Sequence, residues 1–436
     1  MSELAAEAFI YGFPMVFDLQ QVERFIKQGI GSVPASPFNA LGHANQLAGP
    51  NERFVSINND TVYSIANVDV SGGPARFDVP DSHGRYYVMQ FVDAWTNNFA
   101  YVGHRATGTE AASYLLVAPD WDGEPPADAT LIRFPTAVAT IVGRWGVDGE
   151  EDLPAVRALQ GELKLTPTSA GRGVPEPDPS VPDDLLFFEQ MRRWMRAFPP
   201  AARDRDYQQR FEPLGLLATD SPFTDGGSEL ATTLRAGIAA GRERIEEALR
   251  QGAGPEQNGW KLTYHAFDYN LDFFEVGALD DGRWKMTDGP GRYLTRALAA
   301  RGGLWGNHGY EAAYAMIYVD AEGNELDGAR GYELRFTSPP PCRAFWSVTM
   351  YDTPDFFLVA NAIDRYSIGD RTPGLHAGDD GSLTIVMQPD EPSEPERRAN
   401  WLPTPAGTFR PILRMYEPDD AVFDGRYELP PITRTR

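Results

Sequence analysis

Residues 343–371, RAFWSVTMYDTPDFFLVANAIDRYSIGDR, form the densest apolar and aromatic run in this 436-residue sequence. The continuous apolar character of Phe345–Tyr351 predicts an extended, buried β-strand. Asp352–Asp355 predicts a turn, because Pro354 fixes φ and the aspartates can bond the backbone locally. The apolar run resumes at Phe356–Val359. This segment therefore predicts a hairpin around which a β-rich fold is organised.

An earlier segment, residues 85–103 (RYYVMQFVDAWTNNFAYVG), repeats this pattern of an arginine, an apolar run, an aspartate, a turn and a second apolar run. Three further pairs of landmarks keep the same order: Tyr63–Asp69 with Tyr314–Asp320, Ser113–Asp120 with Ser382–Asp390, and Pro135 and Arg144 with Pro405 and Arg414. The preserved order favours an internal duplication. The alternative is that any two β-hairpins share turn residues and apolar runs.

The composition is that of a globular protein, with 42% hydrophobic residues and a length that suits two domains. The net charge of −23 repels phosphate backbones, so no nucleic-acid partner is expected. The single cysteine, Cys342, excludes an intrachain disulfide and a cysteine-rich zinc site. The acidic start, Met1–Glu7, is unlike a secretory signal, and no apolar run reaches membrane-spanning length. We therefore expect a cytoplasmic protein without a membrane partner.

Short apolar runs separated by Gly, Pro and Asp predict an antiparallel β-sandwich in the first part of the chain. The predicted strands are residues 62–70, 75–79, 85–92, 98–102, 113–117, 130–134 and 138–147. Before them, residues 5–25 predict two helices separated by a kink at Pro14.

After the first strands the periodicity becomes helical. Helices are predicted at residues 152–165, 184–198, 228–251 and 291–301, and a strand at 261–267. The fold class is thus mainly β with a helical insert between two tandem antiparallel β-sandwich domains. We place an N-terminal domain at residues 1–150, a mainly helical connection at 151–302 and a second β domain at 303–436.

Several segments resemble a known pair of domains. Residues 6–16 (AEAFIYGFPMV), 59–64 (NDTVYS) and 85–90 (RYYVMQ) resemble the domain of unknown function 1254; residues 365–371 (RYSIGDR) and 400–403 (NWLP) resemble its usual C-terminal partner, the domain of unknown function 1214. The resemblance covers nearly the whole chain and implies jelly-roll-like sandwiches, which are also similar to those of some glycan-cleaving enzymes. It implies no defined activity, because the family is largely uncharacterised.

The sequence departs from the family pattern at two places that could carry chemistry special to this protein. His104 stands where the family tends to have a small polar residue. Residues 303–308 read GLWGNH where the family tends to have Gly-Leu-Gly-Ala-Asn, which introduces Trp305 and His308.

Motifs for common cofactors and nucleophiles are missing from the sequence. There is no Gly-x-Ser-x-Gly elbow, no phosphate-binding Gly-x-x-x-x-Gly-Lys loop and no dinucleotide-binding Gly-x-Gly-x-x-Gly. We therefore expect no cofactor and no metal. The six histidines are scattered, which leaves a metal site assembled from distant strands, as in cupin-like barrels, as the alternative.

Two polar constellations adjoin predicted strands. Asn59, Asp60 and Tyr63 could line a pocket with Asp60 as a base; alternatively they cap the entry to a strand. Asp93 and Trp95, like Tyr351 and Asp352, combine a carboxylate with an aromatic ring, which is typical of sugar-binding and general-acid sites. Because both copies carry the aspartate, a structural turn is the favoured interpretation.

Three further residues are candidates for binding or proton transfer. Arg144, matched by Arg414, could bind a carboxylate or phosphate bidentately, or form a buried ion pair with Asp148 or another acid. His104 and His308 could shuttle protons. Our hypothesis is that His308, with Asp60 or Asp93 near it, forms the acid–base element.

These residues predict an acid–base enzyme, a hydrolase or lyase, acting on a small polar metabolite or glycan-like substrate without a nucleotide cofactor. The predicted catalytic residues are His308, Asp60, Asp93 and His104, and the predicted substrate-binding residues are Asn59, Tyr63, Trp95, Arg144, Trp305, Tyr351 and Trp401. One alternative is a non-catalytic carbohydrate-binding protein that uses Trp95, Trp305 and Trp401 as aromatic platforms. Another is an assembly protein, and a homo-oligomer is left open.

Overall fold

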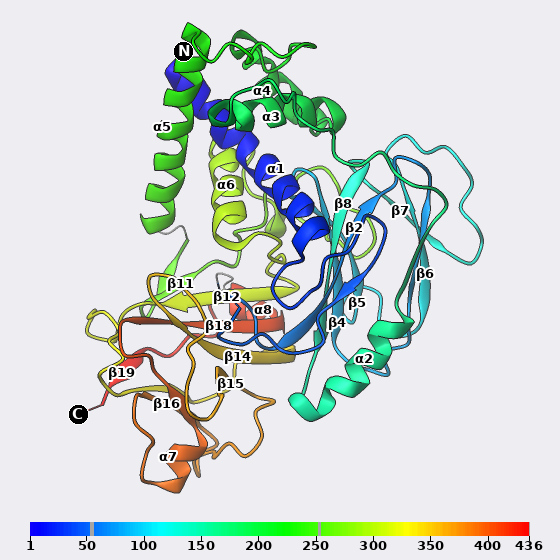
Figure 1. Cartoon of the computed structure of the whole chain (residues 1–436). Coiled ribbons are helices and arrows are strands. Elements are labelled where there is room, and N and C mark those ends of the chain that lie inside the picture. The colour runs from blue at the N-terminus through cyan, green and yellow to red at the C-terminus, as the bar shows by residue number, and fades with distance from the viewer. Residues whose placement is uncertain (53–55, 252–253, 436) are drawn as a thin grey trace.

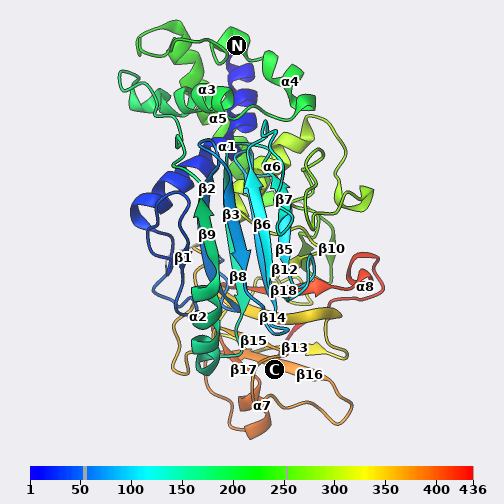
Figure 2. The ribbon, with the colours of Figure 1, turned by 90° about the vertical axis from the view of Figure 1, so that its right-hand side faces the viewer.

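The first half of the chain builds two β-sheets that share one core. The computed structural model describes residues 1–52, 56–251 and 254–435. The large sheet has the order β1 (Gly42–His43), β2 (Thr61–Asp69), β8 (Val138–Gly146), β4 (Tyr87–Asp93), β5 (Asn98–Gly103). The small sheet has the order β7 (Thr130–Arg133), β6 (Ala112–Val117), β3 (Ala75–Val79), β9 (Lys164–Pro167). Figure 2 shows the small sheet in front of the large one. Apolar side chains of both sheets form a single cluster that includes Phe77, Phe91 and Ile141.

The second half repeats this arrangement. Its large sheet has the order β10 (Glu256–Gln257), β11 (Trp260–Leu262), β12 (Ala312–Ile317), β18 (Phe409–Pro418), β14 (Cys342–Asp352), β15 (Ser367–Gly369). Its small sheet has the order β17 (Trp401–Pro403), β16 (Leu383–Gln388), β13 (Tyr332–Phe336), β19 (Ile432–Arg434). In Figure 1 these strands lie crosswise to those of the first half.

The two halves agree strand for strand. The order β2-β8-β4-β5 corresponds to β12-β18-β14-β15, and β7-β6-β3-β9 corresponds to β17-β16-β13-β19. Each small sheet contains one parallel pair, at the same place. The registers also agree, since Tyr63 pairs with Arg144 and Tyr314 with Arg414. The shared order supports the predicted duplication, which stays a prediction.

The mainly β fold with helical parts is confirmed. All seven strands predicted in the first half exist with ends within two residues of the prediction. Among the described residues no sheet closes into a barrel. The jelly-roll connectivity and the domain boundaries at residues 150 and 302 stay predictions.

Helices gather at one end of the molecule, above the strands (Figure 1). Helix α1 (Ser2–Gln28) packs against α5 (Glu229–Gln251), α6 (Gly291–Gly303) and α3 (Leu186–Ala197), with the short α4 (Arg205–Gln209) beside them. Helix α2 (Leu153–Glu162) lies at the other end, against the first large sheet; α7 (Pro395–Ala399) and α8 (Asp420–Phe423) are short. The four helices predicted after residue 150 are therefore present.

The predicted kink at Pro14 is wrong in one respect, because the structure has one continuous helix through it. Pro14 is buried, and so are apolar residues on both sides of it, such as Phe9 and Leu19. Tertiary packing along the whole length of α1 thus outweighs the hydrogen bond that proline cannot donate.

The hairpin predicted around residues 343–371 is only partly correct. β14 is the predicted strand and lies inside the sheet, but its neighbours are β18 and β15. The segment that follows the turn touches β14 through a single bridge between Tyr351 and Leu358. The strand predicted at 261–267 is also shorter, ending at Leu262.

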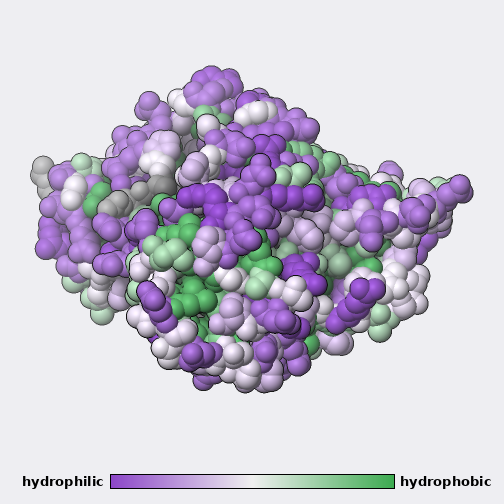
Figure 3. Space-filling view, turned by 90° about the horizontal axis from the view of Figure 1, so that it is seen from above, coloured by the Kyte–Doolittle hydropathy of each residue, from purple (hydrophilic) through white to green (hydrophobic). Residues whose placement is uncertain are grey.

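The surface of the helical end is largely hydrophilic, with small hydrophobic areas between charged groups (Figure 3). No helix in the described residues has both the length and the apolar character needed to cross a bilayer.

Candidate functional site

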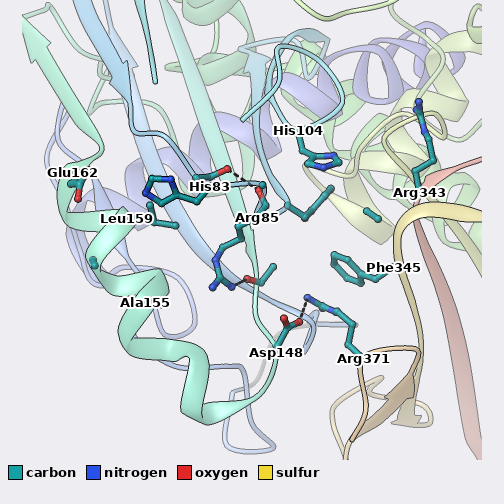
Figure 4. A pocket seen from close by; sticks show the side chains of 16 residues that line it. His83, Arg85, His104, Asp148, Ala155, Leu159, Glu162, Arg343, Phe345 and Arg371 are labelled. Atoms are coloured by element: carbon teal, nitrogen blue, oxygen red, sulfur yellow. Dashed lines mark hydrogen bonds and ion pairs between the residues drawn. The ribbon is translucent and has the colours of Figure 1, made fainter. Parts of the chain in front are cut away.

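A cleft of about 620 Å³ opens where the two halves meet. We call it the inter-domain cleft. The first half lines it with α2, the segment Ser82–Tyr86, His104 and Asp148; the second half contributes Arg343–Phe345 and Arg371. Figure 4 shows α2 on one side, Phe345 and Arg371 opposite it, and His104 between them at the edge.

His104 is a predicted catalytic residue that lies in this cleft. It follows β5, and its Nδ1 donates a hydrogen bond to Oε1 of Glu417 at 2.7 Å. The His104 side chain is 32% exposed, whereas that of Glu417 is 2% exposed. A buried carboxylate on Nδ1 fixes the ring and leaves Nε2 as the basic nitrogen. The pair has the makeup of an oriented acid–base group.

The backbone of Glu417 has a left-handed conformation with a φ of 51°. For a residue other than glycine this conformation costs on the order of 1–3 kcal/mol, and such strain gathers at functional sites. The amide of Glu417 donates to the carbonyl of Glu311 at 2.9 Å. The fold thus holds Glu417 in place against a local backbone preference.

Arginines supply positive charge to the inter-domain cleft. Arg371 stacks on Phe345, with its guanidinium carbon 3.5 Å from the ring centre, and pairs with Asp148 at 3.2 Å. Arg85 is held by both carboxylate oxygens of Asp152. The exposed side chain of Arg343 has no ion-pair or hydrogen-bond partner within the described parts of the chain. Arg343 and Arg371 are therefore placed to bind an anionic group.

Behind the cleft, the two large sheets face each other across a buried polar zone. We call its four symmetry-matched residues, Tyr63, Arg144, Tyr314 and Arg414, the tyrosine–arginine layer. Arg144 donates from Nη1 to Oε1 of Gln90 at 2.8 Å and from Nη2 to the carbonyl of Trp305 at 2.7 Å. The buried ion pair with Asp148 that we considered for Arg144 is wrong, because Asp148 pairs with Arg371 instead.

Arg414 repeats this pattern from the other half. It donates from Nη1 to Oγ1 of Thr349 at 3.1 Å and from Nη2 to the carbonyl of Ser56 at 2.8 Å. Gln90 and Thr349 occupy equivalent strand positions, two residues after the partners of the two arginines in β4 and β14. Each arginine therefore binds one side chain of its own half and one carbonyl from the segment that enters the other half.

Asp60 joins the two halves through hydroxyl groups. Its Oδ2 accepts hydrogen bonds from Ser347 at 2.7 Å and from Tyr416 at 3.1 Å, and its backbone carbonyl accepts one from Arg371. Asn58 bonds both Tyr416 and Thr61. The polar cluster before β2 thus anchors that strand to the second half, between the inter-domain cleft and the tyrosine–arginine layer.

His308 lies in the same zone but has other partners than we predicted. Its Nδ1 lies 2.9 Å from the hydroxyl of Tyr101 and 3.1 Å from that of Tyr310, and neither Asp60 nor Asp93 is hydrogen-bonded to it. Burial, with the charge of Arg105 as a second cause, lowers the pKa of His308 to about 3. The ring is therefore neutral near pH 7.

The predicted aromatic platforms are buried and bonded. The indole nitrogens of three tryptophans donate to Phe198, Asp18 and Gln388: those of Trp95, Trp305 and Trp401, respectively. Tyr351 donates to the carbonyl of Ile57 at 2.5 Å, and Asn59 to that of Ala48 at 2.6 Å. None of these residues lines the inter-domain cleft.

Asp93 forms the turn that we favoured for it. Its carboxylate accepts hydrogen bonds from the amides of Trp95 and Asn97 and from the Asn97 side chain. Burial raises the pKa of this carboxyl to about 6, although these bonds oppose the shift. Asp93 lies outside the cleft.

Within the described ranges no group of three or more His, Cys, Asp or Glu side chains is placed to hold a metal ion. The residues that sequence reasoning missed are Glu417, Arg343 and Arg371. Glu417 had one signal, since it is an acid at the end of the fully buried strand β18.

Comparisons with known proteins agree with the domain resemblance. Residues 38–167 match the model described as Protein of unknown function (DUF1254), and residues 311–420 match Protein of unknown function (DUF1214). No protein with a curated description matches the sequence.

Two crystal structures are similar to the chain. The VPA0106 protein from Vibrio parahaemolyticus has 24% identity over 100% of both chains and a TM-score of 0.72, which shows a shared fold. An uncharacterized protein from Burkholderia cenocepacia has 13% identity over 99% of this chain and 89% of its own, with a TM-score of 0.46. The chain therefore belongs to the family in which domain of unknown function 1254 is followed by domain of unknown function 1214.

Proposed function

We propose that the protein is an acid–base enzyme, a hydrolase or lyase, that acts on a small polar substrate carrying an anionic group in the inter-domain cleft. The observation that carries this proposal is the His104–Glu417 pair at the edge of an arginine-lined cleft. His104 serves as the general base or acid in place of His308, which is neutral and bonded to tyrosines.

The arginines define the class of substrate. Arg343 is exposed in the cleft, and Arg371 presents its guanidinium over Phe345. A planar guanidinium recognises carboxylates and phosphates bidentately, which favours acidic sugars, sugar phosphates and hydroxy acids over neutral glycans. A neutral-sugar binder would instead need exposed aromatic rings, and Trp95, Trp305 and Trp401 are buried.

The experiment has two stages. Wild-type protein is first screened by thermal shift against uronic acids, sugar phosphates and hydroxy acids, because ligand binding to the native state raises the melting temperature. Each ligand that raises it is then incubated with the protein, and conversion is followed by NMR.

We expect His104→Gln to retain the thermal shift while turnover falls by about 10²- to 10⁴-fold, the range for loss of a general acid or base. The matched control is His83→Gln, because His83 also lines the cleft but is exposed, and its ion-pair partner among the described residues is Asp81. Unchanged turnover in His104→Gln would contradict the proposal. Ligand binding without any conversion by the wild type would instead establish a non-catalytic binding protein.

A further inference from the structure

The buried zone behind the inter-domain cleft carries more positive than negative charge. Arg144, Arg410 and Arg414 are 7%, 5% and 4% exposed, and none of them forms an ion pair within the described residues. Asp60 is the carboxylate that acts on Arg414. The other acids of the zone are already paired, Glu311 with Arg105 and Glu417 with His104. Burial of unpaired guanidinium groups is unfavourable unless an anion compensates them.

The hydrogen bonds of these arginines do not supply that charge. Arg144 and Arg414 donate to two amide side chains, a hydroxyl and two backbone carbonyls, all of them neutral. Arg410 donates to the hydroxyls of Tyr318 and Ser56.

Polar atoms around the layer also lack partners. The Nδ2 of Asn307, the hydroxyl of Tyr86 and the Nε of Arg410 are buried without a hydrogen bond. Asn307 contacts Arg144 through its Oδ1, and Tyr86 interacts electrostatically with Glu311 and Glu417 and, less strongly, with Arg144 and Tyr314. Buried donors without partners are rare in proteins and call for an explanation. An anion beside Arg144 would give the Nδ2 of Asn307 an acceptor.

The two tyrosines of the layer are not fully enclosed. Tyr63 and Tyr314 lie on central strands whose flanking residues Val62, Ser64, Ala313 and Ala315 are all buried, yet both tyrosines keep partial exposure. Their rings are within reach of the arginines, since Arg144 lies 5.5 Å from the ring centre of Tyr63 and acts on Tyr314. Both tyrosines therefore keep some solvent-accessible surface and lie near a buried arginine.

We propose that the tyrosine–arginine layer binds one small oxyanion, a phosphate, sulfate or carboxylate group, between the two halves of the chain. Guanidinium N–H groups and the tyrosine hydroxyls donate to its oxygens, and its charge compensates the arginines. This site is separate from the inter-domain cleft and does not depend on the proposed enzymatic activity.

The test counts anions on the full-length protein. Purified protein is dialysed against buffer containing only chloride and then unfolded, and released phosphate, sulfate and organic acids are measured by ion chromatography. A second sample is titrated with phosphate, sulfate or malonate at constant ionic strength, and the melting temperature is recorded. We expect the layer to hold one anion per chain, either retained through dialysis or bound in the titration, in addition to anions that bind the inter-domain cleft. Inorganic phosphate and malonate are titrated separately. Comparison of their affinities shows whether the layer prefers an inorganic ion or the carboxylate of a metabolite.

Arginine-to-glutamine variants in the layer and in the inter-domain cleft show which of the two binds the anion. Arg144→Gln removes a charged donor, so we expect the affinity for the anion to fall about ten- to hundredfold. Arg343→Gln alters only the inter-domain cleft and should leave the affinity unchanged. If Arg144→Gln does not fold, Tyr314→Phe removes one hydroxyl donor and should weaken binding by a smaller factor.

Two results would overturn the proposal. One is wild-type protein that neither retains an anion nor is stabilised by one. The other is binding that is lost in Arg343→Gln but kept in Arg144→Gln or Tyr314→Phe, which would place the anion in the cleft instead.

Discussion

The two β-rich halves have the same strand order, but they bring opposite charges to their contact. The loop after β5 in the first half contributes His104 and Arg105. In the second half, Glu417 pairs with His104 and Glu311 pairs with Arg105. The matched residues inside the large sheets, Tyr63 with Tyr314 and Arg144 with Arg414, are identical in the two halves. The centre of the contact is thus symmetric and its edge is complementary, and the proposed acid–base pair belongs to the edge.

We expect the largest effect on stability at Glu311, because Glu311 and its matched residue Asp60 have different bonding partners. Asp60 and Glu311 each stand three residues before the matched tyrosines, but Asp60 accepts from hydroxyls and Glu311 binds Arg105 at 2.5 Å. Glu311→Ala leaves the Arg105 guanidinium unpaired, so we expect a loss of about 3–5 kcal/mol in the free energy of unfolding. Urea unfolding followed by circular dichroism measures it.

Asp60→Ala is the comparison for this prediction. It removes hydrogen bonds to one carboxylate, and we expect a smaller loss of about 1.5–3 kcal/mol. Equal losses for the two variants would mean that the different partners of Asp60 and Glu311 do not matter for stability.

A second effect concerns the turn aspartates Asp93 and Asp352, which follow equivalent strands. Asp93 is fully buried with a pKa raised to about 6, whereas Asp352 is partly exposed. Because the native state holds the Asp93 proton more tightly than the unfolded state does, the contribution of this carboxyl to stability is fully present below about pH 4. It falls as the pH rises from about 4 to about 6, by about 3 kcal/mol for a shift of two pKa units.

Asp93→Asn should flatten this dependence, because an amide keeps the acceptor for Trp95 and Asn97 but does not ionise. The measurement is the free energy of unfolding at pH 4, 5, 6 and 7 for wild type, Asp93→Asn and Asp352→Asn. The interpretation fails if the wild-type slope survives in Asp93→Asn or disappears in Asp352→Asn.

The smallest effect tests whether the halves are equivalent in detail. Gly103 and Gly369 pair with Val88 and Ser347, which hold the same position in β4 and β14. A Cβ at Gly103 would lie 2.2 Å from the carbonyl oxygen of Tyr87, and one at Gly369 would lie 2.0 Å from that of Trp346. We expect Gly103→Ala and Gly369→Ala each to cost about 1–3 kcal/mol from overpacking, with a further cost at Gly103, whose φ of 143° is rarely adopted by residues with a Cβ.

Thermal unfolding of the two glycine variants measures these costs. Gly407→Ala, at a glycine with open space around the added carbon and no left-handed φ, separates the clash from the loss of a glycine. A cost in one half without a similar cost in the other would contradict the detailed equivalence.

Local patterns were enough to predict the strands and the matched landmarks. Tyr63 and Tyr314, and Arg144 and Arg414, could be aligned from sequence because strand spacing is regular and turns contain Gly, Pro and Asp. Pro14 misled the helix prediction, because contacts of α1 with α5 and α6 are not visible in the local sequence.

For the candidate site, single residues could be predicted from the sequence, but not the partners that they contact. His104 was identified as an unusual residue, but its partner Glu417 lies 313 positions away, and Arg144 is bonded by a carbonyl 161 positions away. Local periodicity carries no information on such pairings. His308 was given the wrong partners for the same reason, since Tyr101 is 207 positions from it.

Two hydrogen bonds to backbone carbonyls tie the halves of the chain to each other. Trp305, which enters the second half, binds Arg144 of the first; Ser56, which enters the first half, binds Arg414 of the second. Such reciprocal exchange is the contact of a swapped, isologous dimer, here contained in one polypeptide. Neither half contains all the hydrogen-bond acceptors of its own buried arginine. Two fragments cut within the helical connection would therefore have to associate before either could complete its own interior.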